Sequence, residues 1–296
     1  MKKYILLFLV ILITISGVII WQGSYLGSIV KRVVLIGESQ LAAVALTITS
    51  PFHYTFKVDG VLKETGAMEE SPSPYFWLNS GGMFLLKDGI GKTAQGELEK
   101  LNKWRVTYAA SNPTDTDGGY HPQNIFRLIT RSKWQNFQQT IYAKIKKYNL
   151  SESKNRSESN GLLLFNRYVD SDNLYYAGIR VDGTAVIKKK INGNYYTLAQ
   201  KSFYKADVPY NRDTNPNIIP SQKWIGLRSE IKTNPDNTVS IKFFIDKDKT
   251  GNWILAVEAK DDGKSYGGSA ILSEGYAGIR TDFMDVEFDD YKIIKQ

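Results

Sequence analysis

Two copies of one seven-residue run carry side chains that suit ligand recognition. Residues 176–182 read Tyr-Ala-Gly-Ile-Arg-Val-Asp, and residues 276–282 read Tyr-Ala-Gly-Ile-Arg-Thr-Asp. Because side chains alternate between the faces of a strand, the Tyr, Gly, Arg and Asp of each copy share one face, and the Ala and Ile point into the core. A ring, a bare backbone and a guanidinium on one face suit a flat polar ligand such as a sugar. The alternative is that Arg180 and Arg280 pair with nearby carboxylates.

A second set of residues has the chemistry to move a proton beside a carboxylate. His121 is one of two histidines in the chain, and Arg127 and Arg131 have the spacing that places both on one face of a strand. An arginine neutralises a carboxylate while a His or Tyr removes the neighbouring proton and an enolate-like intermediate forms. If the protein is an enzyme, the candidate catalytic residues are His121, Arg127, Arg131 and Tyr176.

Basic and aromatic residues in the middle of the chain form the candidate binding surface. Residues 121–205 contain fifteen Lys and Arg against five Asp and Glu, a net charge of +10, whereas the whole chain carries +8. Concentrated positive charge attracts anionic partners, which for an exported protein are acidic polysaccharides or lipid headgroups more readily than nucleic acid. The alternative is a solvated surface without a partner. The predicted ligand-binding residues are Tyr142, Lys144, Arg167, Tyr176, Arg180, Lys188 and Arg228.

Metal sites are predicted only at acidic loops. Asp115 and Asp117 lie in a Pro-Thr-Asp-Thr-Asp-Gly-Gly run, and calcium takes several oxygen ligands from a tight loop of this kind. The similar run at residues 246–251 lies between two expected strands and is interpreted as a hairpin turn. The chain has no Cys, which excludes disulfides, thiolate metal sites and a Cys nucleophile. With two histidines, a dedicated zinc or copper site is not expected.

The elements that position these residues are predicted to be short strands. Asp-Gly and Asn-Gly pairs separate alternating apolar runs, which is a strong hairpin signal, and regular repetition of such strands favours a β-sandwich. One short helix is expected at residues 94–103. Residues 151–160 and 204–221 read as long loops, which are functional lids or inserts. The expected strands are residues 54–58, 83–86, 161–168, 174–181, 184–191, 195–198, 224–232, 239–245, 253–259, 275–280 and 286–294.

The N-terminal residues predict export. Lys2 and Lys3 precede an apolar run from Ile5 to Trp21, which is just long enough to cross a bilayer and lacks an Ala-x-Ala cleavage site. We expect residues 1–24 to be an uncleaved signal-anchor with one transmembrane helix, or else a cleaved signal peptide that leaves the protein secreted. Residues 25–50 form a tether or first strand, and residues 51–296 form a single domain outside the cytoplasm.

The second half of the chain resembles a known superfamily. The runs at residues 161–168, 172–183 and 188–190 are similar to the middle strands of concanavalin A-like lectin/glucanase jelly rolls, which include laminin G-like modules. Gly275 to Arg280, followed by Val286-Glu-Phe-Asp-Asp-Tyr291, is similar to their closing strands. The resemblance implies an all-β, two-sheet antiparallel jelly-roll sandwich that binds or processes glycans, sometimes with structural calcium. It adds Asp289 to Asp115 and Asp117 as a candidate calcium ligand.

The resemblance leaves the activity open. The glucanases of this superfamily carry a Glu-x-Asp-x-x-Glu strand that is not found here, and Asp285, Glu287 and Asp289 have a different spacing. Lyases on this fold use an Arg with a Tyr or His, so a polyuronate lyase is the enzymatic alternative. The favoured hypothesis is a membrane-anchored protein that binds a glycan, and the preferred glycan is acidic. The third hypothesis is a structural or adhesion module without a small ligand.

Overall fold

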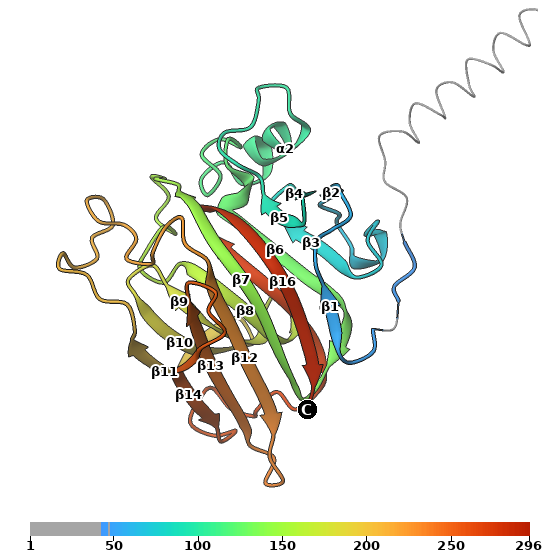
Figure 1. Cartoon of the computed structure of the whole chain (residues 1–296), viewed down its shortest axis with the longest axis vertical. Helices are drawn as coiled ribbons and strands as arrows, with labels where there is room; N and C mark the ends of the chain where they lie inside the picture. The colour runs from blue at the N-terminus through green and yellow to red at the C-terminus, as the bar shows by residue number, and fades with distance from the viewer. Residues whose placement is uncertain (1–42, 47) are drawn as a thin grey trace, which may run out of the picture. The chain divides into compact units, whose positions relative to one another are not determined.

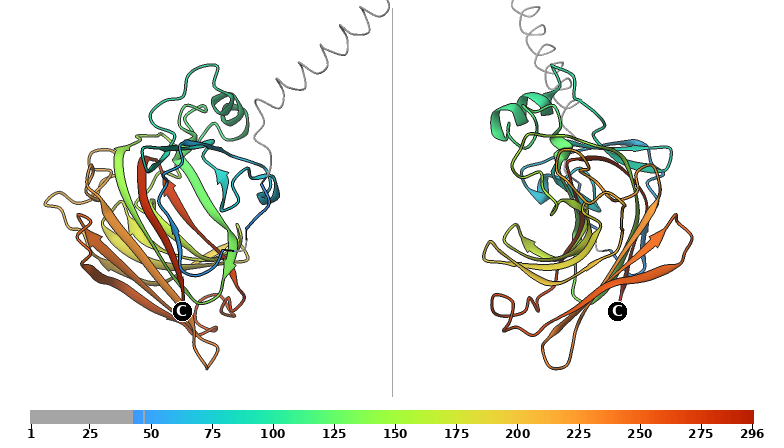
Figure 2. Two further views of the ribbon diagram at one scale, coloured as in Figure 1. Left: turned by 45° about the vertical axis from the view of Figure 1, so that its right-hand side comes forward. Right: turned by 90° about the vertical axis from the view of Figure 1, so that its left-hand side faces the viewer.

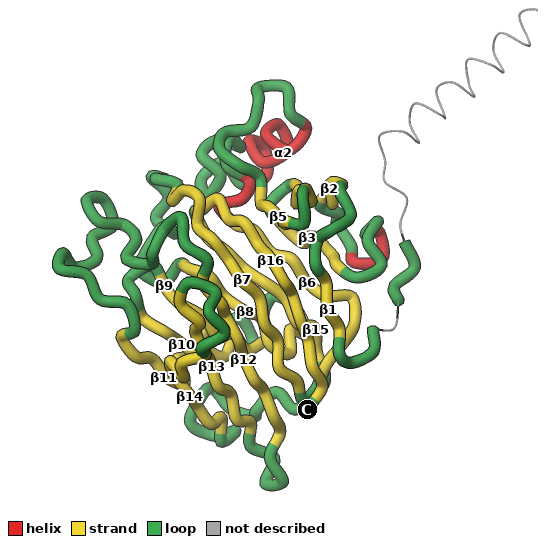
Figure 3. Tube along the Cα trace, in the orientation of Figure 1, coloured by secondary structure: helices red, strands yellow, loops and turns green. Residues whose placement is uncertain are grey.

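Two antiparallel sheets pack face to face across a shared apolar core (Figure 1). The computed structural model describes residues 43–46 and 48–296. Strands dominate this part of the chain, as Figure 3 shows, and helix is confined to short segments. The predicted all-β, two-sheet antiparallel sandwich is therefore confirmed.

Sheet A contains nine strands in the order β14-β13-β12-β7-β16-β5-β4-β2, with β1 paired to β16. Its first and last strands along the chain, β1 and β16, thus lie side by side. The bounds of sheet A are β1 Phe52–Tyr54, β2 Gly60–Lys63, β4 Met83–Lys87, β5 Ile90–Thr93, β7 Phe137–Tyr148, β12 Ile225–Thr233, β13 Val239–Lys247, β14 Trp253–Asp261 and β16 Met284–Lys295.

Sheet B contains seven strands in the order β11-β10-β9-β8-β15-β6-β3. Short connections join β8 to β11 in sequence, and β15 is inserted between β8 and β6. The bounds of sheet B are β3 Phe76–Ser80, β6 Ile125–Trp134, β8 Gly161–Asp170, β9 Asn173–Arg180, β10 Thr184–Ile191, β11 Asn194–Ser202 and β15 Gly275–Asp282.

Alternation along each strand builds the core. In β7, Ile141, Ala143 and Ile145 are buried between the sheets, while Tyr142 and Lys144 lie on the opposite face. This in-and-out pattern is the period-2 signal that the sequence carries, and burial of the apolar set fixes the register of each strand. Each sheet therefore has an outer face, turned away from the core, which carries polar side chains.

The repeated seven-residue run forms two strands that both pair with β8. Residues of the first copy lie in β9, and residues of the second lie in β15. Ala177 and Ile179 belong to the central core, as do Ala277 and Ile279. The tyrosine of the first copy joins a separate apolar cluster on the outer face of sheet B. The predicted assignment of faces is thus confirmed for both copies.

One end of the sandwich carries helix α2, Lys103–Ser111, together with the loops that surround it (Figure 2). The helix was expected at residues 94–103, and that prediction is wrong. The Asn102 side chain accepts a hydrogen bond from the Trp104 amide at 2.9 Å, so the N-cap fixes the start of the helix there. Gly96 has a φ of +65°, which is incompatible with a right-handed helix through residues 94–103.

The N-terminal predictions fall mostly outside the described residues. The expected signal-anchor at residues 1–24 and the first part of the expected tether at 25–50 lie there. From Ala43 onward the chain bonds to the domain, since the Ala43 amide donates to the Ser71 carbonyl at 2.9 Å. Among the residues that the structure describes, no helix is both long and apolar enough to cross a membrane.

Candidate functional site

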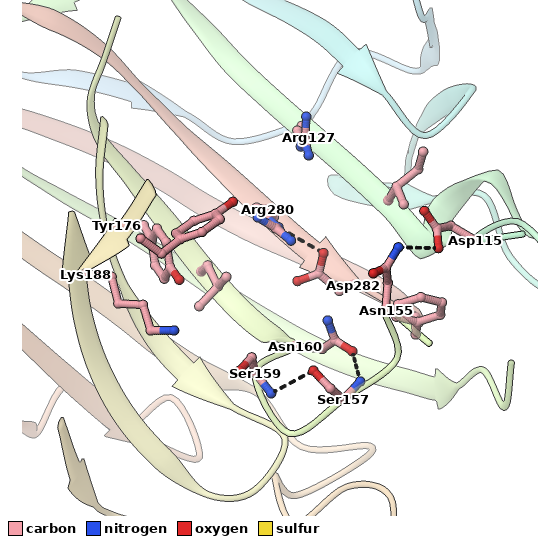
Figure 4. Close-up of a pocket in the computed structure, with 14 residues that line it drawn as sticks. Asp115, Arg127, Asn155, Ser157, Ser159, Asn160, Tyr176, Lys188, Arg280 and Asp282 are labelled. Carbon is pink, nitrogen blue, oxygen red and sulfur yellow. Dashed lines mark hydrogen bonds and ion pairs between the residues drawn. The ribbon is translucent and has the colours of Figure 1, made fainter. Parts of the chain in front are cut away.

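The outer face of sheet B contains a pocket with a volume of about 350 Å³ (Figure 4). Its floor is built by side chains from five neighbouring strands: β6, β15, β8, β9 and β10. Its rim is formed by residues 155–160 of the long loop before β8. These floor residues are Arg127, Arg280, Leu163, Tyr176 and Lys188.

Two cations of this pocket have no protein partner. Among the described residues, neither the Arg127 guanidinium nor the Lys188 ammonium makes a hydrogen bond or an ion pair. Burial and the neighbouring Arg280 lower the pKa of Arg127. Burial, with Arg180 and Arg280 nearby, lowers the pKa of Lys188. Half-buried cations without an ion-pair partner are costly. The carboxylates of Asp115 and Asp282 also line the pocket, but neither pairs with these two cations.

The arginines of the repeated run are paired instead. Arg280 Nε donates to Asp282 Oδ1 at 2.9 Å, and Arg180 Nη2 lies 3.0 Å from Asp182 Oδ2. In each copy the Arg therefore pairs with the Asp two residues later, on the same strand face. The alternative interpretation of the repeat, in which its arginines pair with carboxylates, is correct for both copies.

Aromatic rings form one wall of the pocket. The rings of Tyr176 and Tyr195 meet edge to face, with centroids 6.1 Å apart. Burial raises the pKa of the Tyr176 hydroxyl, so this group stays neutral at ordinary pH and is a poor base. The pocket therefore has a mixed lining, in which aromatic rings lie beside charged donors.

The rim of the pocket is held by the two predicted calcium ligands of the 112–121 loop. Asp115 Oδ1 accepts hydrogen bonds from Ser153 Oγ at 2.6 Å and from Asn155 Nδ2 at 2.9 Å. Asp117 accepts a hydrogen bond from the Ser151 hydroxyl. Burial acts to raise the pKa of Asp115, but these donors outweigh it and the pKa is lowered. The two carboxylates therefore hold the 151–160 loop in place at the rim of the pocket.

The predicted calcium ligands do not converge. Asp289 lies on β16 in sheet A, where it forms an ion pair with Lys249, and it takes no part in the loop around Asp115 and Asp117. The described residues contain no cluster of three or more His, Asp or Glu side chains that could hold a metal ion. The groups that bond Asp115 and Asp117 are hydroxyl and amide groups of the protein itself, together with the His121 ring.

The candidate catalytic residues are only partly brought together. Arg127 and Tyr176 line the same pocket, as the lyase hypothesis requires. His121 bonds Asp117 through Nδ1 at 2.8 Å, while its Nε2 is buried without a partner, and it does not line the pocket. Arg131 donates to the carbonyls of Ala43 and Ser73 at 2.6 and 2.7 Å. Of this set, the pocket thus brings together Arg127 and Tyr176 and leaves out His121 and Arg131.

The predicted ligand-binding residues divide between the two sheets. Tyr176 and Lys188 line the pocket, and Arg180 lies beside it, where its Nε donates to the Glu158 carbonyl at 3.0 Å. Tyr142, Lys144 and Arg228 lie together on the outer face of sheet A.

Arg167 has a structural position. It is fully buried, and it donates to the carbonyls of Gln135 and Ile271 at 2.8 and 2.6 Å. It also donates to Asn136 Oδ1 at 3.1 Å and to Thr233 Oγ1 at 2.7 Å. Every one of these partners is a protein acceptor, so Arg167 is not exposed to a ligand.

Residues 121–205, which carry a net charge of +10, do not form one basic face. Arg156, Arg167 and Lys189 are buried, and Lys144 is on sheet A. The residues of the block that line the pocket as cations are Arg127 and Lys188, and Arg280 joins them from outside it. A net charge counted along the sequence cannot distinguish these positions, because successive residues of a strand point to opposite faces.

Several pocket residues were not predicted from the sequence. Tyr195 is the second residue of β11, and Asn155 and Asn160 belong to a polar loop with no distinguishing pattern. The sequence did contain one signal for this pocket, the repeated run, because Arg280 is the arginine of its second copy. Its place in the pocket follows from β15 pairing with β8, a contact between strands more than 100 positions apart in the sequence.

No protein-family model and no curated protein sequence matches the chain. Three solved structures show a similar fold. Carbohydrate-binding module CBM66 from Bacillus subtilis is 15% identical with a TM-score of 0.40, over 58% of this chain and 83% of that one. A Bacillus subtilis protein of unknown function with a galectin-like fold is 13% identical (TM-score 0.44; 86% and 99% covered). A Bacillus licheniformis β-glucanase is 9% identical (TM-score 0.42; 84% and 100% covered).

The likeness is one of fold. The ligand of this chain has to be inferred from the residues of its own pocket.

Proposed function

We propose that the protein is a carbohydrate-binding β-sandwich whose pocket on sheet B accepts an acidic glycan. The observation that carries this proposal is the pair of unpartnered cations, Arg127 and Lys188, in a pocket walled by Tyr176 and Tyr195. A carboxylate or sulfate group supplies the missing counter-charge, and the rings pack against the apolar face of a sugar.

The spacing of the two cations favours an oligosaccharide over a single small anion. The strand order places β6 and β10 four steps apart. At about 4.8 Å per step, the backbones at Arg127 and Lys188 are about 19 Å apart. Both side chains line the pocket together with Leu163, so we expect a ligand that meets both to be longer than one sugar ring. A smaller hollow that shares Arg127 and Tyr176 is also lined by Phe165 and Tyr168.

A panel of polysaccharides tests this proposal. The purified full-length chain is titrated with matched neutral and acidic polymers at low and high salt, and ultraviolet absorbance is followed for unsaturated products of β-elimination. We expect binding to the acidic polymers that weakens with salt, because exposed and half-buried charges are screened. Equal binding to neutral polymers would overturn the acidic preference, and product formation would identify a lyase.

We also propose that residues 1–24 anchor the protein in a membrane with the domain outside the cytoplasm. The apolar run from Ile5 to Trp21 supports this, together with the two lysines before it. Alkaline carbonate extraction and protease accessibility of intact cells test it. The expected result is a carbonate-resistant protein that external protease degrades, whereas release into the soluble fraction with residues 1–24 intact would contradict it.

A further inference from the structure

The outer face of sheet A carries a second arginine without a partner. Arg228 lies on β12, and among the described residues its guanidinium makes no hydrogen bond or ion pair. Its Nε is buried and has no acceptor. The neighbouring cations differ, because Lys144 pairs with Glu287 at 2.7 Å and Lys249 pairs with Asp289.

Aromatic rings hold this arginine in place. The Arg228 Cζ atom lies 3.9 Å from the centroid of the Trp253 ring, and the Trp253 ring lies 5.9 Å from that of Tyr142. A guanidinium stacked on an indole keeps its edge donors free for a planar anion. The side chain is therefore pre-organised, so less conformational freedom is lost when it meets a carboxylate or sulfate group.

Strand β12 leaves room for these rings because it has a glycine beneath them. Gly226 precedes Arg228 by two residues, so both lie on the outer face of β12. A Cβ atom at Gly226 would lie 2.7 Å from the Trp253 ring and 2.8 Å from the Tyr142 ring. The two rings thus rest directly on bare backbone. Trp224 continues the platform along the sheet, because Lys249 lies over both its ring and that of Tyr142, at 5.4 and 5.0 Å.

Hydrogen-bond donors without partners dominate this platform. The indole N–H groups of Trp224 and Trp253 donate to no described residue, and Arg228 adds its own free donors. Three acidic groups at its edge are already engaged: Tyr142 Oη donates to Asp246 Oδ2 at 3.1 Å, Asp289 pairs with Lys249, and Glu287 pairs with Lys144. Glu230 follows Arg228 by two residues on β12 and its charge acts on the guanidinium, but the two side chains form no ion pair among the described residues. Charge complementarity therefore favours an acceptor-rich, anionic ligand.

We propose that Arg228, Trp253, Tyr142 and Trp224 form a second binding site, specific for an acidic sugar of a polysaccharide chain. This inference rests on the proposed function only for the class of ligand, because the second site uses other residues on the other sheet. The two sites lie on the outer faces of opposite sheets. One molecule therefore binds two polymer chains at once and cross-links them.

Bridging of a uronate polymer tests the second site. The full-length chain is added to immobilised polygalacturonate, and capture of fluorescent polygalacturonate from solution is measured. We expect capture by the wild-type protein and its loss in Arg228→Gln, which keeps binding of a short galacturonate oligomer at the pocket. Lys242→Gln is the matched control, because Lys242 is exposed on the same face and has no partner among the described residues.

A pocket-deficient variant separates the two proposals. Arg127→Gln/Lys188→Gln should still bind the polymer directly, and adding Arg228→Gln should weaken that residual binding by about tenfold or more. If the double variant loses all binding, the second site is wrong and the pocket stands. If no uronate polymer binds either face, both proposals are wrong. Binding of a single-stranded oligonucleotide in place of the polymer would also overturn the assignment of ligand.

Discussion

At the scale of single residues, two cations of the pocket form no ion pair within the described part of the chain. Arg180 and Arg280 each have an acidic partner two residues away, whereas Arg127 and Lys188 have none among the described residues. Because an unpaired, half-buried charge costs stability, the proposed anionic ligand would offset that cost.

Alkaline pH should weaken ligand binding through Lys188. The ammonium must be protonated to attract an anion, and burial lowers its pKa below that of an exposed lysine. Binding should therefore be strongest at neutral pH and fall as the pH rises through this lowered pKa. Titrations from neutral to alkaline pH measure this effect. Lys188→Arg should abolish the alkaline loss, because arginine stays charged; an unchanged alkaline loss in that variant would rule out Lys188 as its source.

At the scale of elements, the strands were predictable and their partners were not. Alternation and local turn residues predict β8 to β10 closely, because each hairpin is local. The strand expected at residues 195–198 covers only part of β11, Asn194–Ser202. The face of each residue in the 176–182 run followed from the same alternation. The pairing of β15 with β8 and β6 has no local signal, and this pairing brings Arg280 beside Arg127. The separation of Tyr142 and Arg228 from Tyr176 was unpredictable for the same reason.

The glycine of the first repeated run is required by packing within sheet B. A Cβ atom at Gly178 would lie 2.3 Å from the Leu162 carbonyl oxygen on β8. Gly178→Val should therefore destabilise the fold by about 3 kcal/mol or more, because backbone cannot yield as a flexible side chain does. Urea unfolding measures the change. Gly60→Val is the control, since Gly60 has no atom within 4 Å of the added Cβ and should stay within about 0.5 kcal/mol of the wild type.

The loop over the pocket should loosen when its acidic anchor is removed. Asp115→Ala deletes the acceptor for Ser153 and Asn155, so the 151–160 loop loses two of its bonds to the 112–121 loop. Hydrogen exchange of the 151–160 amides should become faster, while the core strands stay protected. Protection that is unchanged in the loop would show that other contacts hold it in place.

At the scale of the whole molecule, Arg167 connects distant parts of the sandwich. Its guanidinium joins the β6–β7 turn, the segment before β15 and the end of β12 through Gln135, Ile271 and Thr233. Arg167→Met should lower the free energy of unfolding by about 3–5 kcal/mol, because it leaves buried acceptors without donors. Thermal and chemical unfolding measure this loss. A near-neutral variant would contradict the structural assignment of Arg167 and reopen its predicted role in binding.

The central claim is that Arg127 and Lys188 together bind the charges of one acidic oligosaccharide. The most direct test is calorimetric titration of a galacturonate hexamer into the full-length wild type, Arg127→Gln, Lys188→Gln and the exposed-site control Lys201→Gln. Each pocket variant should bind about tenfold to a hundredfold more weakly and with a smaller dependence on salt, and the control should match the wild type. Equal affinities across all four proteins would contradict the account.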